Sequence, residues 1–154
     1  MKRLALLVLS VGWLVGTAGQ IAIADQIKEE AIAKARLSYE GTWRVVALQI
    51  DGESAPPKDL EKVTVINHID GTWILMIDKT EVASGTSTID PTKRIKTIDF
   101  TVAGDVERKV YVGIYELRGN YRTLCYASVG KDRPTEFLST PGSGRTLVGF
   151  QRIR

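Results

Sequence analysis

The stretch EGTWRVVALQIDG, Glu40 to Gly52, marks the point at which this chain changes from a helical to a strand pattern. It holds a glycine, a tryptophan two residues later, an apolar run and a closing Asp-Gly pair. Short runs of β-branched and aromatic residues that end in turn-forming residues predict strands. We therefore expect a first strand over residues 42–50, entered through Gly41, and its apolar character on both faces does not assign which side points inwards.

Seven further runs of strand-forming residues follow the first. They lie at residues 62–69, 72–78, 81–89, 95–102, 109–117, 121–128 and 145–153. Asp70-Gly71 and Gly119-Asn120 predict two-residue hairpins, because glycine and asparagine accept the positive φ that such turns require. Connections this short make neighbouring strands antiparallel. The sequence therefore predicts an all-β fold, an eight-stranded antiparallel up-and-down barrel over residues 41–154.

Upstream of this barrel the pattern is helical. The segment DQIKEEAIAKARLSYE, residues 25–40, places Ile27, Ala31 and Ala35 at a four-residue spacing opposite a charged face. That spacing is typical of an amphipathic helix. We expect a short N-terminal lead-in helix over residues 25–40 that lies against the barrel.

Residues 1–24 have the build of a secretory signal peptide. Lys2 and Arg3 precede an apolar run, and Ala22-Ile23-Ala24 forms a small-residue cleavage pattern. A membrane anchor is the alternative, but glycines interrupt a stretch that is short of the roughly 20 apolar residues a span needs. We expect cleavage after Ala24, a secreted or periplasmic location in the cell envelope, and no stable membrane anchor after cleavage.

Charge and cysteine content narrow the classes of partner. The chain carries 21 Lys+Arg against 18 Asp+Glu, and removing Lys2 and Arg3 with the expected signal leaves 19 against 18, a net charge of +1. Nucleic-acid-binding surfaces carry a dense basic stripe, so no nucleic-acid partner is expected. Cys125 is the only cysteine, which excludes an intrachain disulfide.

Gly41-Thr42-Trp43, the strand count and the leading helix together resemble the lipocalin-like superfamily. In that superfamily a Gly-x-Trp tripeptide begins the first strand, the tryptophan plugs one end of the barrel, and an arginine from beyond the last strand stacks on the indole. The resemblance gives Gly41, Trp43 and Arg152 (or Arg154) the structural role of barrel closure. A guanidinium over a tryptophan ring contributes about 0.5–2 kcal/mol.

A closer likeness covers nearly all of residues 25–154. GTWRVV, DPTKRIKTIDFT, GIYEL, LCYA and RPTEFLSTPGSG are similar to motifs of an uncharacterised family of secreted lipocalin-like domain proteins from planctomycete-type bacteria. That resemblance implies a fold and a compartment, and it carries no biochemical activity. Arg122 stands where the family pattern has an apolar residue, so the facing of strand 121–128 stays open.

Few residues could support catalysis or metal binding. His68 is the only histidine, so a catalytic triad or a histidine metal site would have a single member, and we interpret it as a half-exposed strand residue. Nothing near Cys125 in the sequence would lower its pKa, so it is interpreted as a small buried hydrophobe. We expect no enzyme, no catalytic residue, no metal and no cofactor.

Aromatic residues recur about once per strand. Alternation within residues 109–117 places Tyr111 and Tyr115 on one side, which we expect to face inwards. An eight-stranded barrel is either filled by side chains or holds one small ligand, and both interpretations stay open. The first functional hypothesis is non-catalytic binding of a small apolar ligand, lined by Trp73, Tyr111, Tyr115 and Tyr126.

Residues 129–144, VGKDRPTEFLSTPGSG, form an expected long loop before the last strand. Loops of this length are uncommon in compact domains and are usually functional or disordered. Phe137 and Leu138 predict that the loop packs against the barrel. The alternative function is a protein-interaction module, an inhibitor or envelope scaffold, in which Arg133, Glu136 and Phe137 meet a partner on a filled barrel.

Overall fold

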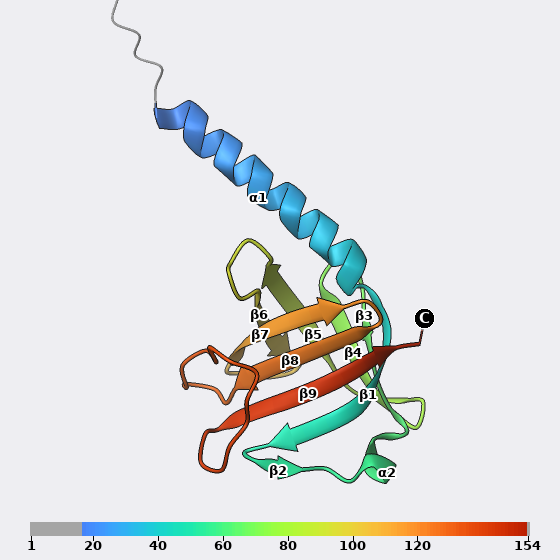
Figure 1. Cartoon of the computed structure of the whole chain (residues 1–154). Helices are drawn as coiled ribbons and strands as arrows, with labels where there is room; N and C mark the ends of the chain where they lie inside the picture. The colour runs from blue at the N-terminus through green and yellow to red at the C-terminus, as the bar shows by residue number, and fades with distance from the viewer. Residues whose placement is uncertain (1–16, 154) are drawn as a thin grey trace, which may run out of the picture.

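The computed structural model describes residues 17–153. A long helix leads into nine strands and one short helix (Figure 1). The elements are α1 (Thr17–Tyr39), β1 (Gly41–Ile50), β2 (Glu53–Ser54), α2 (Pro57–Leu60), β3 (Val63–Asn67), β4 (Thr72–Ile77), β5 (Thr80–Asp90), β6 (Thr97–Val102), β7 (Val110–Arg118), β8 (Tyr121–Ala127) and β9 (Arg145–Arg152). The predicted class, an all-β barrel preceded by a helix, is confirmed.

The barrel consists of β1 and β3 to β9, each paired antiparallel with its neighbour in the order β1-β3-β4-β5-β6-β7-β8-β9. The last strand returns to the first, from Trp43 opposite Arg152 to Ile50 opposite Thr146, and this pairing closes the barrel. A register shift between Val45 and Ala47 bends β1 where it meets β9. The two-residue strand β2 pairs only with the end of β1.

The tight turns follow the predicted chemistry in one place and depart from it in another. Gly119-Asn120 is the two-residue link between β7 and β8, as predicted, and Gly119 has φ 59°. The prediction of a two-residue hairpin at Asp70-Gly71 is wrong, because β3 ends at Asn67 and the link covers residues 68–71. The Asp70 carboxylate accepts hydrogen bonds from the Thr72 amide at 2.8 Å and hydroxyl at 2.7 Å, which stabilises the wider turn.

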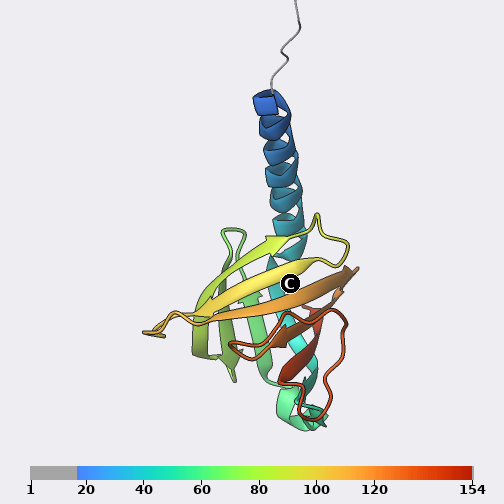
Figure 2. The same cartoon turned by 90° about the vertical axis from the view of Figure 1, so that its left-hand side faces the viewer.

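Helix α1 begins earlier than residue 25 and runs through the expected cleavage position after Ala24. Residues 17–24 contain no proline and a single glycine, so nothing there interrupts a helix. Residues 1–16 of the expected signal peptide lie outside the described part of the chain. Figures 1 and 2 show α1 leaving the barrel, so that only its later turns touch the strands.

The contacts of α1 with the barrel come from its second half. Lys28 pairs with Asp90 at 3.2 Å, and Arg36 donates to the Ser87 hydroxyl at 3.1 Å and to the Ser87 carbonyl. Tyr39 is buried at the end of the helix. This end of the barrel is thereby covered by α1. Within residues 17–153, no helix combines the length and apolar character needed to cross a bilayer.

Candidate functional site

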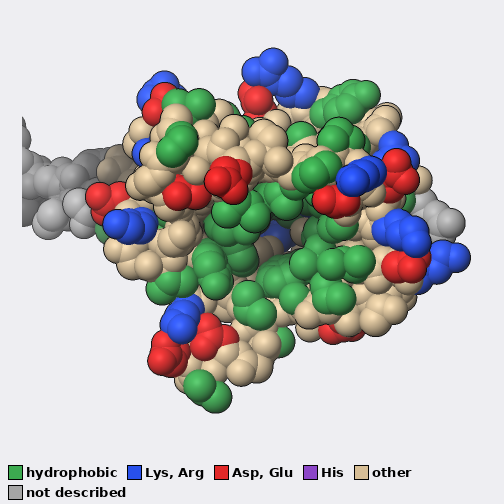
Figure 3. All heavy atoms as spheres, turned by 90° about the horizontal axis from the view of Figure 1, so that it is seen from below, with side chains coloured by type: hydrophobic (Ala, Val, Ile, Leu, Met, Phe, Trp, Pro, Cys, Tyr) green, Lys and Arg blue, Asp and Glu red, His purple; other side chains and the backbone are tan. Residues whose placement is uncertain are grey.

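An apolar cavity of about 460 Å³ lies inside the barrel and opens at the end opposite α1. Figure 3, viewed from below, shows a hollow lined by hydrophobic side chains with basic atoms at its floor. Ile50 and Ile77 stand at the open end, 54 % and 45 % exposed. The other aliphatic lining residues are Val45, Leu48, Ala55, Leu60, Val63, Val65, Leu75, Ile98, Leu124 and Val148. The volume falls within the roughly 300–1,000 Å³ typical of small-molecule sites.

One wall of the cavity is an interlocked aromatic cluster centred on Phe100. Phe100 stacks on Tyr111 with 5.0 Å between ring centroids and meets Tyr126 edge-on, also at 5.0 Å. Trp73 meets Phe100 edge-on at 6.1 Å. Trp73, Phe100 and Tyr126 line the cavity, whereas Tyr111 stands behind Phe100 and is not among the lining residues.

Tyr115, the fourth residue expected to line a ligand site, lies elsewhere in the barrel. It is 2 % exposed and packs edge-on against Tyr39 with 5.2 Å between ring centroids, at the end covered by α1. Its hydroxyl has no hydrogen-bond partner among the described residues. Burial raises the pKa of this hydroxyl to about 12. Tyr115 therefore belongs to the packed end of the interior, outside the cavity.

Polar side chains are scarce in the cavity lining. Ser87 already accepts a hydrogen bond from Arg36 and donates to the Gly71 carbonyl at 3.1 Å. Asn67 is 6 % exposed, and its Nδ2 has no acceptor among the described residues. Asp59 lines the cavity from α2 and is exposed to solvent.

Arg122 is the one basic residue among the described residues that line the cavity. Within β8 it shares the inward side with Leu124 and Tyr126, which settles the facing of that strand. It is 2 % exposed, and its guanidinium carbon lies 4.1 Å, 4.5 Å and 4.6 Å from the ring centroids of Phe150, Tyr39 and Trp43. Sequence reasoning did not assign Arg122 to the site, although its alternation with Leu124 and Tyr126 was the available indication.

Two nitrogens of the Arg122 guanidinium lack a hydrogen-bond partner among the described residues. Its Nε and Nη1 atoms have no acceptor, and no carboxylate within residues 17–153 lies at ion-pair distance from it. Burial lowers the pKa of the guanidinium, and the nearby Arg152 acts in the same direction. Arginine is not deprotonated in proteins, so the buried group remains a cation.

Trp43 closes the barrel end near α1. It is fully buried, and its Nε1 donates to the Tyr39 carbonyl at 3.0 Å. The guanidinium carbon of Arg152 lies 4.1 Å from the Trp43 ring centroid, and its nitrogens donate to the carbonyls of Ser38 and Glu40. Gly41 enters the strand at φ 127°, a conformation that favours glycine.

The loop of residues 129–144 packs on the outside of the barrel and none of its residues lines the cavity. Arg133 pairs with Asp99 at 2.6 Å and donates to the carbonyls of Gly113 and Ile98 at 2.7 Å and 3.1 Å. Pro134 beside it is fully buried. Arg133 thus fastens the loop to β6 and β7.

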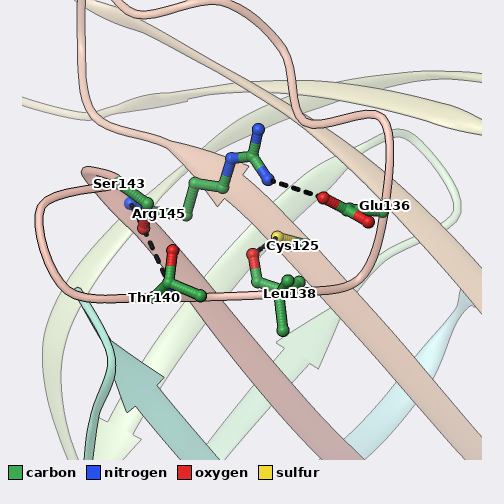
Figure 4. A network of polar contacts seen from close by, with 6 residues as sticks. All are labelled: Cys125, Glu136, Leu138, Thr140, Ser143 and Arg145. Atoms are coloured by element: carbon green, nitrogen blue, oxygen red, sulfur yellow. Dashed lines mark hydrogen bonds and ion pairs between the residues drawn. The ribbon is translucent and has the colours of Figure 1, made fainter.

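Two further residues expected to meet a partner lie in the same loop. Glu136 approaches Arg145 at 3.7 Å, and Phe137 is half-buried. Figure 4 shows Glu136 and Arg145 together with the contact between the Cys125 thiol and the Leu138 carbonyl at 3.7 Å. Cys125 is fully buried, and burial raises the pKa of its thiol.

His68 lies exposed in the turn after β3, because that strand ends one residue earlier, at Asn67. Within residues 17–153, no three His, Cys, Asp or Glu side chains gather as metal ligands. Comparison with protein-family models, with curated proteins and with solved structures finds no match for this chain. Function is therefore inferred from the geometry of the cavity.

Proposed function

We propose that this protein is a lipocalin-like, non-catalytic binder of one small apolar molecule, held in the barrel cavity. The observation that carries the proposal is the cavity of about 460 Å³, whose lining is predominantly aliphatic and aromatic. Burial of apolar surface contributes about 25 cal/mol per Å² to the free energy of binding, so burial alone favours an apolar molecule in such a cavity.

The aromatic cluster supports a preformed site. Phe100 holds Trp73, Tyr111 and Tyr126 by edge-on and stacked contacts, so the wall keeps its shape when no ligand is present. Preformed pockets lose little side-chain entropy on binding. Gly85 contributes to this shape, because a Cβ there would lie 2.8 Å from Cζ2 of Trp73.

We propose further that the protein acts outside the cytoplasm, in the envelope or secreted, after removal of residues 1–24. Support comes from Lys2, Arg3, the apolar run and the Ala22-Ile23-Ala24 pattern. The contacts of α1 with the barrel include those of Lys28, Arg36 and Tyr39, which all lie after Ala24, so cleavage there would retain them. N-terminal sequencing of the protein from the producing cell tests this proposal, and an N-terminus at Met1 would contradict it.

Two variants on β4 test the binding proposal. Leu75 lines the cavity, whereas its neighbour Ile74 is not among the lining residues. Leu75→Trp places an indole in the cavity, which occupies part of its volume, and is expected to weaken binding of the neutral probe N-phenyl-1-naphthylamine, measured by its fluorescence. Ile74→Trp is the matched control and is expected to bind as the wild type does. Circular dichroism checks that both variants fold, and equal binding by the two variants would overturn the proposal.

The alternative, a protein-interaction module, gains no specific support from the loop of residues 129–144. Three hydrogen-bonding or ionic contacts of Arg133 go to the barrel itself, which makes its role in this structure internal. We therefore favour the cavity.

A further inference from the structure

We propose that the ligand carries a carboxylate at one end of an apolar chain, and that Arg122 binds this carboxylate. This inference rests on the proposed function, because it names the chemical class that the same cavity accepts. It concerns specificity and adds a polar contact to an otherwise apolar site.

The positive charge of Arg122 is buried without a counter-ion among the described residues. Its guanidinium is 2 % exposed, and neither Nε nor Nη1 meets an acceptor among the described residues. Buried charges in proteins are normally paired, since an unpaired ionised group in the interior is strongly unfavourable. A buried arginine that lines a cavity and has no counter-ion among residues 17–153 therefore indicates a counter-ion supplied by a ligand.

Aromatic rings surround the guanidinium of Arg122. Its guanidinium carbon lies within 4.6 Å of the ring centroids of Phe150, Tyr39 and Trp43. Such rings stabilise a cation, but they do not replace the hydrogen-bond acceptors that its N–H groups need. The neighbouring Arg152 adds positive charge, and its own nitrogens are bonded to backbone carbonyls. Both features leave the site around Arg122 positive.

The polar atoms left unpaired in the buried part of the cavity determine which ligand group they bind. The buried side-chain atoms of the cavity lining that lack a partner among the described residues are donors: Nε and Nη1 of Arg122 and Nδ2 of Asn67. An ionised carboxylate is acceptor-only and complements a donor-only site. A phosphate monoester carries nearly two negative charges, which a single guanidinium does not balance.

The position of Arg122 orients the ligand. Arg122 packs against Tyr39 and Trp43 at the end covered by α1, whereas Ile50 and Ile77 stand at the open end. The carboxylate would therefore enter first, and the apolar chain would extend back towards α2. The aliphatic walls between these ends offer no other charged group among the described lining residues except Asp59 at α2.

A series of matched amphiphiles tests the inference on the full chain. Dodecanoate, dodecanol, dodecylamine and dodecyl phosphate share one alkyl chain and differ in the head group. We expect dodecanoate to bind about ten- to a hundred-fold more tightly than dodecanol, the range of a charge-assisted hydrogen bond, as measured by titration calorimetry. Dodecylamine is expected not to bind. Tighter binding of dodecyl phosphate than of dodecanoate would overturn the choice of carboxylate.

Variants then identify the residue. Arg122→Met removes the charge and keeps an unbranched apolar side chain, so the preference for dodecanoate over dodecanol is expected to vanish while dodecanol still binds. Arg118→Met is the control, because that arginine is exposed on β7 and lies outside the cavity. A preference that survives Arg122→Met would overturn the assignment.

A second measurement stands independently of how the variant folds. Dodecanoate labelled with ¹³C at the carboxyl carbon reports its own ionisation in the wild-type complex. A buried cation lowers the pKa of a bound carboxylate, so the bound signal is expected to titrate at lower pH than free dodecanoate. Titration at or above the free value would overturn the contact with Arg122. Equal affinity for dodecanoate and dodecanol would overturn the inference and leave the proposed function intact, whereas failure of every amphiphile to bind would overturn the proposed function itself.

Discussion

Arg122 on β8 lies directly opposite Phe150 on β9, and its guanidinium carbon is 4.1 Å from the centroid of that ring. The cross-strand neighbour of the buried cation is thus an aromatic ring rather than a carboxylate. Each contact of this kind contributes about 0.5–2 kcal/mol, whereas burying one ion without a counter-ion costs several kcal/mol. The aromatic contacts of Arg122 therefore offset part of that cost, and we expect the buried charge to lower the stability of the ligand-free protein.

Replacing Arg122 with methionine is expected to stabilise the ligand-free protein. The change removes a buried charge and keeps most of the volume, so the free energy of unfolding in urea should rise by about 1–3 kcal/mol. Such gains are common where a residue is retained for function rather than for stability. A decrease of more than about 1 kcal/mol would mean that the three rings fully compensate the buried cation.

The hydroxyl of Tyr115 offers a test at alkaline pH. Burial raises its pKa from 10.0 to about 12, so the folded state keeps a proton that the unfolded state loses. The resulting stabilisation is complete below pH 10 and is lost as the pH rises towards 12. Tyr115→Phe should remain within about 1 kcal/mol of the wild type at pH 7, because the hydroxyl has no hydrogen-bond partner among the described residues. It should also lose stability less steeply between those two pH values. Tyr121→Phe, at an exposed position, is the control and should behave as the wild type.

Asp90 offers the complementary test at acid pH. Hydrogen bonds from Thr92, and then the charge of Lys28, lower the pKa of its carboxyl from 3.8 to about 2. A lowered pKa stabilises the fold above the unfolded value, and this contribution is lost as the pH falls from about 4 to 2. Asp90→Asn should flatten that part of the stability profile, and Thr92→Val should do so in part. A profile unchanged in both variants would contradict the assignment.

Gly85 on β5 is required by the packing of the aromatic wall. A Cβ at this position would lie 1.9 Å from the Thr101 carbonyl oxygen and 2.8 Å from Cζ2 of Trp73. Gly85→Ala is expected to lower the free energy of unfolding by about 1–3 kcal/mol and to shift tryptophan fluorescence. Gly149→Ala is the matched strand control, because its nearest atom would be the Ala47 Cβ at 3.2 Å. Equal losses in the two variants would contradict a specific role for Gly85.

The thiol of Cys125 should be unreactive in the folded protein. It is fully buried, burial raises its pKa, and its only polar contact among the described residues is the Leu138 carbonyl. Thiolate is the reactive form, so modification by an aromatic disulfide reagent should require unfolding. Rapid modification in native buffer would show that the loop of residues 129–144 opens readily.

Local patterns in the sequence were sufficient for the strands and the overall fold. The hairpin at Gly119-Asn120 was predicted correctly because glycine accepts positive φ whatever its surroundings, and Gly119 has φ 59°. The turn between β3 and β4 was predicted at Asp70-Gly71 but two residues too short, since the link covers residues 68–71 and the Asp70 side chain bonds to Thr72 within it. Strand β2 and helix α2 were also missed, because two and four residues are too few to show a period.

The site was harder to predict because it depends on contacts between distant segments. Trp73 and Tyr126 were expected at the cavity and line it, whereas Tyr115 shares its side of β7 with Tyr111 yet lies nearer α1. Alternation along a strand predicts which side of the sheet a side chain faces. Its position along the barrel axis depends on the register of the closed barrel. The environment of Arg122 could not be predicted for the same reason. Which groups surround its guanidinium, and that no carboxylate among the described residues pairs with it, depends on the assembled interior.

The pairing of β9 with β1 also bears on how the protein behaves when crowded. The unpaired backbone N–H and C=O groups of an edge strand pair with strands of other molecules, which is a common cause of aggregation. Here β1 and β9 pair with each other from Trp43 to Ile50, so neither is an edge strand over that length. Within residues 17–153, β2 is the one strand with a single strand partner, and it is two residues long and begins with Glu53. A short edge strand that carries a charged residue pairs poorly with strands of other molecules. We therefore expect the barrel to stay monomeric at concentrations at which an open sheet of this size would associate.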